Sequence, residues 1–98
     1  MTSKQRAYLQ GLANKQEPVI HIGKNGVTPE VVISINEALE ARELIKIAVL
    51  QNCEEEPSEV ADIVAGRTQS ECVHTIGRKF VLYRQSKTKP VITLPKEK

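Results

Sequence analysis

The stretch Pro18–Glu30 reads Pro-Val-Ile-His-Ile-Gly-Lys-Asn-Gly-Val-Thr-Pro-Glu, and it indicates how the chain folds. Pro18–Ile22 is a short run rich in β-branched residues, which is typical of a buried strand. Gly23–Gly26 then ends the strand, because this composition favours a turn. Thr28-Pro29-Glu30 predicts a helix start, with a capping hydroxyl, a proline at the first helical position and an acid in the first turn. A strand, a loop and a helix therefore follow one another directly.

Helices and strands alternate on both sides of this stretch. Thr2 and Gln5 have the spacing of a capping box, so a helix is expected near the N-terminus. In chain order we predict a helix from Thr2 to about Asn14, a strand over Pro18–Ile22, a helix from Thr28 to about Arg42, a strand over Leu44–Leu50, a helix capped by Ser58 and ending near Gly66, and two strands over Cys72–Ile76 and Phe80–Arg84.

This order predicts an α/β fold. Each strand–helix–strand crossover should be right-handed and place its helix on the same face of the sheet. Gly77-Arg78-Lys79 has the length of a hairpin connection, so the last two strands should be antiparallel and the sheet mixed. We therefore predict a two-layer α-β-α-β-α-β-β sandwich with a four-stranded mixed sheet. Part of the second sheet face should be open or covered by the first helix.

Apolar residues at helical spacing define the expected core. The predicted stripes are Tyr8, Leu9, Leu12 and Ala13 in the first helix, Val31, Val32, Ile35, Ala38, Leu39 and Arg42 in the second, and Val60, Ile63 and Val64 in the third. Phe80 and Tyr83 are expected to pack in the core or on a face of the sheet.

Length and composition bound the class of protein. Ninety-eight residues suffice for one domain, so we expect residues 1–98 to form a single unit with a basic tail from about residue 85. No apolar run approaches the ~20 residues that cross a bilayer, and no hydrophobic stretch follows the polar N-terminus. We expect a cytoplasmic protein that has no membrane partner.

The chain has two cysteines, Cys53 and Cys72, and two histidines. A structural zinc site normally needs four closely spaced ligands, so we predict no metal and no other cofactor. In a reducing cytoplasm the two thiols should stay reduced.

The net charge of +2 hides an uneven distribution. Residues 1–26 carry +3, residues 27–71 carry −7 and residues 72–98 carry +6. Two basic ends around an acidic middle suggest that a polyanion lies against one face, although chance clustering explains this pattern about as well.

Gly23-Lys24-Asn25-Gly26 is the first candidate binding site. Two glycines let the backbone approach a ligand closely, amides at the following helix start attract anions, and Lys24 adds a positive charge. G-x-x-G loops grip the nucleic-acid backbone in this way in KH domains. An isolated G-x-x-G is more often a plain turn.

Basic residues near the second end of the chain are the other candidates. Arg78 and Lys79 lie at the predicted hairpin tip, and Arg84 follows it. Lysine and arginine supply most of the non-specific affinity for RNA through phosphate contacts. We expect these three residues and Lys24 to border a common surface, with the acids Glu37, Glu40 and Glu54–Glu56 pointing elsewhere.

No set of residues suggests catalysis. His21 and His74 have no identifiable Ser, Cys or carboxylate partner, and Glu54–Glu56 resemble a solvated face. The spacings of a nucleotide triphosphate loop and of a dinucleotide-binding loop are missing. We predict that the chain is not an enzyme and has no small-molecule substrate.

Several segments, in order, resemble one known family. They are residues 4–13, the segment from Pro18 to Thr28, Ala38-Leu39-Glu40, Glu43-Leu44-Ile45-Lys46-Ile47, the segment from Ile76 to Arg84, and Leu94-Pro95. Together they are similar to the YhbY-type CRM domain, named for chloroplast RNA splicing and ribosome maturation. The resemblance spans nearly the whole chain, and it makes the plain turn the weaker interpretation of Gly23–Gly26.

The resemblance implies both a fold and a function. The fold would be similar to the C-terminal domain of bacterial translation initiation factor three. The function would be RNA binding, with ribosomal RNA or large-subunit precursor particles as the partner and a role in ribosome assembly in bacteria. Gly23, Lys24, Asn25 and Gly26 match the family's RNA-contacting loop, and Arg78, Lys79 and Arg84 match its hairpin less tightly. The alternative is a protein-interaction module that uses its acidic helices.

Overall fold

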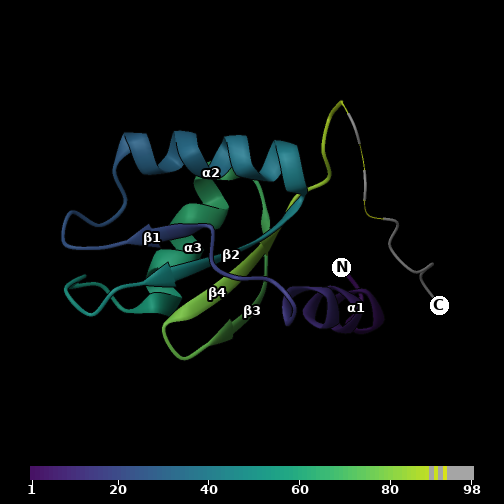
Figure 1. The fold of residues 1–98 in the computed structure, drawn as a ribbon, viewed down its shortest axis with the longest axis horizontal. Coiled ribbons are helices and arrows are strands. Elements are labelled where there is room, and N and C mark those ends of the chain that lie inside the picture. Colours follow the sequence, from purple (N-terminus) through teal and green to yellow (C-terminus); the bar gives the residue numbers. More distant parts are fainter. Residues whose placement is uncertain (89, 91, 93–98) are drawn as a thin grey trace.

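A computed structural model describes residues 1–88, 90 and 92 of the chain (Figure 1). Its elements are α1 (Ser3–Ala13), β1 (Ile20–Ile22), α2 (Pro29–Arg42), β2 (Leu44–Val49), α3 (Pro57–Thr68), β3 (Glu71–Ile76) and β4 (Lys79–Tyr83). This is the predicted α-β-α-β-α-β-β order. Most of the predicted basic tail lies outside the described residues.

The four strands form one mixed sheet in the order β1-β2-β4-β3. β1 pairs with β2 in parallel, and β4 pairs with both β2 and β3 antiparallel. The α/β fold class and the mixed sheet predicted from the sequence are therefore confirmed. Because β1 and β2 are parallel, the loops that follow them lie at the same end of the sheet, on the left in Figure 1.

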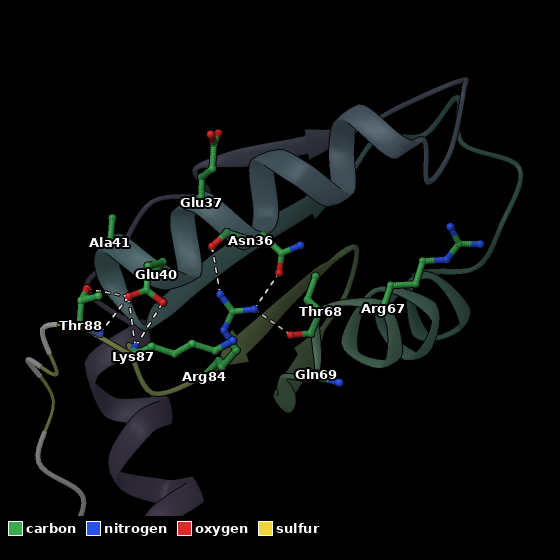
Figure 2. Close-up of a pocket in the computed structure, with 10 residues that line it drawn as sticks. All are labelled: Asn36, Glu37, Glu40, Ala41, Arg67, Thr68, Gln69, Arg84, Lys87 and Thr88. Atoms are coloured by element: carbon green, nitrogen blue, oxygen red, sulfur yellow. Dashed lines mark hydrogen bonds between the residues drawn. The ribbon is translucent and has the colours of Figure 1, made fainter.

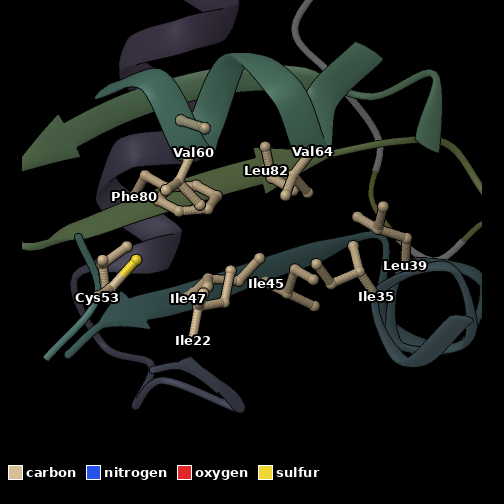
Figure 3. Close-up of a cluster of buried hydrophobic side chains, with 12 residues drawn as sticks. Ile22, Ile35, Leu39, Ile45, Ile47, Cys53, Val60, Val64, Phe80 and Leu82 are labelled. Atoms are coloured by element: carbon tan, nitrogen blue, oxygen red, sulfur yellow. The ribbon is translucent and has the colours of Figure 1, made fainter. Parts of the chain in front are cut away.

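The main core fills the space between the sheet and helices α2 and α3 (Figure 3). Alternate residues of a strand point to the same face, so the inward side chains of β2 and β4 meet those of both helices. Its most buried large side chains include Ile22, Ile35, Leu39, Ile45, Ile47, Val60, Phe80 and Leu82. The two helices after β1 and β2 thus share one face of the sheet, as expected.

A second, smaller core lies on the other face of the sheet, where α1 packs. Leu9 and Ala13 of α1 contact a cluster that contains Leu44, Val73 and Tyr83. The sandwich therefore gains a third layer over part of the sheet. Tyr8, expected in the apolar stripe of this helix, is 42% exposed.

Helix α3 differs from its prediction at both ends. Ser58 is not its cap: Glu56 holds the cap position without a side-chain hydrogen bond, and Pro57 is the first helical residue. The helix also continues past Gly66 to Thr68 and ends where Gln69 adopts a left-handed conformation with φ 55°. A glycine inside a helix costs only about 1 kcal/mol, which the packing of the remaining turns offsets.

The apolar stripe of α3 also differs from its prediction. Ala61 is buried, whereas Ile63, expected in the core, is 36% exposed. In α2, the bounds and the Thr28 cap agree with the prediction, and the hydroxyl of Thr28 accepts a hydrogen bond from the Val31 amide.

Glu43 ties the C-terminal segment to the fold. Its side chain is fully buried and accepts hydrogen bonds from the amides of Ser86 (2.6 Å) and Ile92 (2.7 Å). Its own carbonyl accepts from the amide of Arg84. The pKa of the nearby Tyr83 is raised by burial and by the charge of Glu43. The carboxylate of Glu43 thus binds two backbone amides of the segment after β4, which is distant from Glu43 in sequence.

Both cysteines are free thiols. Cys53 is buried in the main core, and Cys72 is half-buried, with its Sγ 3.7 Å from Oγ1 of Thr75. Within the described residues, no group of three or more metal-binding side chains is arranged to hold an ion, and none of the helices is long and apolar enough to cross a membrane.

We predict that Glu43→Ala lowers the free energy of unfolding by roughly 2–5 kcal/mol, because the amides of Ser86 and Ile92 lose a buried acceptor. The positive φ of residue 43 (66°) is as unfavourable for glutamate as for alanine. Backbone strain therefore does not contribute to the expected change in the free energy of unfolding. Urea unfolding measures the change. Glu37→Ala, at an exposed position of α2, is the control and should change the value by no more than about 0.5 kcal/mol. Equal effects of the two substitutions would contradict the role of Glu43.

Candidate nucleic-acid interface

Gly23–Gly26 forms a tight turn directly after β1. The amide of Gly26 donates to the carbonyl oxygen of Gly23 at 2.9 Å. Gly26 has a φ of 65°, a conformation that a residue with a Cβ adopts only at a cost. Lys24 and Asn25, at the tip of this turn, are exposed. The turn thus presents one ammonium and one amide side chain to solvent.

The helix that follows the loop has little free capacity for an anion. Thr28 already satisfies the Val31 amide through its hydroxyl and the Val32 amide through its carbonyl. Pro29 has no N–H, and Glu30 adds a negative charge in the first turn. Two of the helix-start amides that were expected to attract an anion, those of Val31 and Val32, are therefore already used. The side chains of Lys24 and Asn25 are exposed.

Two side chains of the loop after β2 lie against the glycines. A Cβ built on Gly23 would lie 3.2 Å from Oδ1 of Asn52, and one built on Gly26 would lie 3.0 Å from Oε1 of Glu55. A side chain at Gly23 would need Asn52 to shift slightly, whereas at Gly26 the positive φ favours glycine in addition to the contact with Glu55. Glu55 was expected to point away from the basic surface, and this expectation is wrong: its carboxylate borders the loop.

Arg78 holds the hairpin to the same end of the sheet. Its Nε donates to the carbonyl oxygen of Val49 at 3.0 Å, and its Nη2 donates to that of Leu50 at 2.8 Å. Leu50 in turn donates its amide to the carbonyl oxygen of Ile22, next to the glycine loop. Arg78 is therefore a structural residue, half-buried at the place where the three loops meet.

Lys79 lies beside Arg78, begins β4 and is exposed. It pairs with Ala48 of β2 on one side and with Ile76 of β3 on the other, so it lies near the loop end of the sheet. The structure thus brings together six of the seven candidate residues: Gly23, Lys24, Asn25, Gly26, Arg78 and Lys79.

Arg84, the seventh candidate, lies beyond the opposite end of β4. Its Nη1 donates to Oδ1 of Asn36 (2.7 Å) and to the carbonyl oxygen of Thr68 (2.8 Å), and its Nη2 donates to the carbonyl oxygen of Asn36 (3.1 Å) (Figure 2). Its guanidinium therefore joins α2 to the end of α3. The expectation that Arg84 borders the same surface as Lys24 is wrong, because the length of β4 separates them.

A hollow of about 770 Å³ surrounds Arg84 at this far end. Glu37 and Glu40 lie on its rim, away from the glycine loop, as expected for these two acids. The carboxylate of Glu40 accepts hydrogen bonds from the hydroxyls of Ser86 (2.7 Å) and Thr88 (2.8 Å) and from the amides of Lys87 and Thr88. These donors, the Ser86 hydroxyl first, lower the pKa of Glu40 from its ordinary value of 4.5 to about 2.

Asn52, Glu55 and Lys46 were not predicted from the sequence as residues of the site. Asn52 and Glu55 lie against the loop through contacts between segments about 30 residues apart in sequence, which no local pattern reveals. Lys46 is the single charged residue in the apolar run of β2, and this interruption was the one signal that its side chain leaves the core.

The fold and the loop together define a small α/β domain with a cationic glycine turn at the carboxyl ends of two parallel strands. The chain belongs to the CRS1/YhbY (CRM) domain family, whose model matches residues 1–84. The resemblance noted from the sequence is thereby confirmed.

Similar proteins cover almost the whole chain. "Probable RNA-binding protein YqeI" of Bacillus subtilis is 45% identical over 95 residues, which are 97% of this chain and 99% of that protein. "RNA-binding protein" of Haemophilus influenzae is 36% identical over 97 residues, or 99% and 97% of the two chains. The solution structure of SAV1595 from Staphylococcus aureus has a TM-score of 0.81 and 42% identity, and the match covers 97% of this chain and 99% of that one.

We predict that Glu40→Gln weakens the acid dependence of folding. A carboxyl whose pKa is lowered in the folded state stabilises the fold above pH 4.5 and loses that contribution as the pH falls toward 2. The variant should be less stable than the native protein at pH 7, and the difference should shrink between pH 4.5 and 2. Chemical unfolding at a series of pH values measures this. Glu37→Gln, at an exposed position of the same helix, is the charge-matched control.

Proposed function

We propose that the protein is an RNA-binding ribosome-assembly factor of the cytoplasm, built as one domain, that contacts ribosomal RNA of large-subunit precursors through the Gly23–Gly26 loop and adjacent basic residues. The observation that carries the proposal is the meeting of this loop with Arg78 and Lys79 at one end of the sheet. Membership of the CRM family, and relatives named as RNA-binding proteins, support RNA as the partner.

The chemistry at this end of the sheet suits phosphate. Lys24 and Lys79 are exposed ammonium groups, and Asn25 offers a neutral amide donor. Two glycines keep the turn narrow, so an RNA backbone approaches these donors without meeting a Cβ. Phosphate contacts of this kind fix register but do not read sequence. The function is binding, with no bond made or broken.

Arg78 contributes indirectly. Two of its donors are used on the carbonyls of Val49 and Leu50, which keeps the hairpin against the glycine loop. Its charge adds to the local positive potential, while its position sets the distance between Lys24 and Lys79. Glu55 acts in the opposite sense, because a carboxylate beside Gly26 repels phosphate at the loop.

The experiment that tests the proposal replaces the two residues at the tip of the loop in one variant, Lys24→Asp with Asn25→Asp. It measures the binding of this variant to in vitro transcribed large-subunit precursor RNA at several salt concentrations. Affinity should fall at least about tenfold, and the slope of its salt dependence should decrease by about 1, since a phosphate contact is lost. Both residues are exposed, so the free energy of unfolding should change by no more than about 0.5 kcal/mol.

A charge-matched control is Ser3→Asp with Lys4→Asp, at exposed positions in the first turn of α1, where acids are favourable. It introduces the same charge change at the other end of the molecule and should reduce affinity much less. Equal losses for the two double variants would show that only net charge matters. Unchanged affinity of the folded loop variant would refute the loop as the RNA site. Weak dependence on salt would favour the protein-interaction alternative.

We also predict that Glu55→Gln raises the affinity for RNA about two- to fivefold. The substitution keeps the shape that contacts Gly26 and removes a carboxylate that borders the loop. Binding measured at low salt shows the gain most clearly, and it should shrink at high salt. Glu59→Gln, at an exposed position of α3, is the control. A loss of affinity for Glu55→Gln would mean that this carboxylate orients the loop or the RNA.

A further inference from the structure

One half of the second sheet face has no helix over it. α1 covers the half that contains Leu44, Val73, Val81 and Tyr83. The other half lies toward the glycine loop, because β1 and β2 end there and β4 begins there. Strand register identifies the side chains on it, since residues paired across neighbouring strands point to the same face.

Two rows of side chains cross this open half. The register pairs His21 with Ala48, Ala48 with Lys79, and Lys79 with Ile76, which gives a row across all four strands. The second row, one step nearer to α1, pairs Lys46 with Val81 and Val81 with His74. A bulge between Cys72 and His74 shifts β3 by one residue and places His74 in this second row.

These side chains form a shallow basic hollow with an apolar floor. Its volume is about 160 Å³, and it is lined by Lys46, His74, Ile76, Lys79 and Val81. Val81, which is 5% exposed and also belongs to the core cluster under α1, forms the floor at the border of the covered half, whereas Ile76 is 56% exposed at the edge. None of the residues in the two rows is acidic. The exposed side chain of Ile76, two ammonium groups and two imidazoles therefore lie together on this face.

This combination suits a ligand that is planar in one part and anionic in another, as a nucleotide is. Imidazole rings stack on nucleobases, aliphatic side chains support their faces, and lysines bind the phosphates between them. The face is also continuous with the loop: His21 lies two residues before Gly23, and Lys79 follows Arg78. An RNA strand that leaves the loop meets this face next.

We propose that the open half of the sheet holds one or two nucleotides of single-stranded RNA, with a base over Val81 and Ile76 beside His74 and its phosphates on Lys46 and Lys79. The inference rests on the proposed RNA-binding function and deepens it. The loop accepts a backbone phosphate from single-stranded or double-stranded RNA alike. The sheet face accepts an unpaired base, because stacking needs an exposed base plane.

The test compares a labelled single-stranded oligouridylate with a blunt RNA duplex of the same length. In the double variant Lys46→Gln with His74→Gln, the affinity for the single strand should fall about tenfold, because one stacked base and one phosphate contact are lost. The affinity of the same variant for the duplex should fall by less than about twofold. Lys87→Gln, which removes the same formal charge at the far end, should leave both unchanged. Lys24→Asp with Asn25→Asp should weaken both.

A second measurement does not depend on the folding of variants. Titrating the native protein with the oligouridylate should shift the backbone amide signals of Lys46, His74, Ile76 and Lys79 in NMR spectra. Signal shifts confined to residues 23–28 would overturn the inference while leaving the loop site intact. Equal losses of affinity for single-stranded and duplex RNA in the Lys46→Gln, His74→Gln variant would do the same. Failure of the native protein to bind either RNA would instead refute the proposed function.

Discussion

The pairing of β2 with β1 on one side and β4 on the other determines where everything else lies. The parallel pairing with β1 places the turn at Gly23 next to the end of β2, and the antiparallel pairing with β4 adds the start of the hairpin to the same end. Arg78 then closes this junction with hydrogen bonds to the carbonyls of Val49 and Leu50. Without this register, the cationic turn and Lys79 would be separate surface features rather than one region.

The two ends of the sheet have different electrostatic roles. At the loop end, Lys24 and Lys79 are exposed, and Glu55 moderates their potential. At the far end, charged groups are used internally: Arg84 joins α2 to α3, and the acids Glu40 and Glu43 bind amides and hydroxyls of the segment after β4. Some charged residues are thus exposed at the loop end, and others belong to a polar network that stabilises the fold.

Local signals in the sequence were sufficient for most of the fold. Thr28 and Pro29 fixed the start of α2, because a capping hydroxyl before a proline leaves few alternatives, and the alternation of elements fixed the sheet class. The start of α3 was wrong because Ser58 was taken as a cap, whereas Pro57 already occupies the first helical position. A proline there is itself a start signal, and it outweighs a hydroxyl one residue later.

The candidate site was predictable only in part, and for a clear reason. Composition identified the turn at Gly23–Gly26, but Arg78 and Arg84 look alike in sequence, and only strand register shows that they lie at opposite ends of β4. The approach of Glu55 to Gly26 depends on two loops meeting in space. The bulge in β3 changes which face His74 occupies, so strict alternation along the strand could not place it.

We propose that the glycine loop and the open half of the sheet form one RNA surface. Photo-crosslinking of the native protein to large-subunit precursor RNA that contains 4-thiouridine, followed by mass spectrometry of the peptides, tests it most directly. We expect crosslinks at residues 23–28 and at residues 74–79, and few on the outer faces of α2 and α3. Crosslinks concentrated around Glu37, Arg67 and Arg84, with none at the loop or the open sheet face, would contradict it.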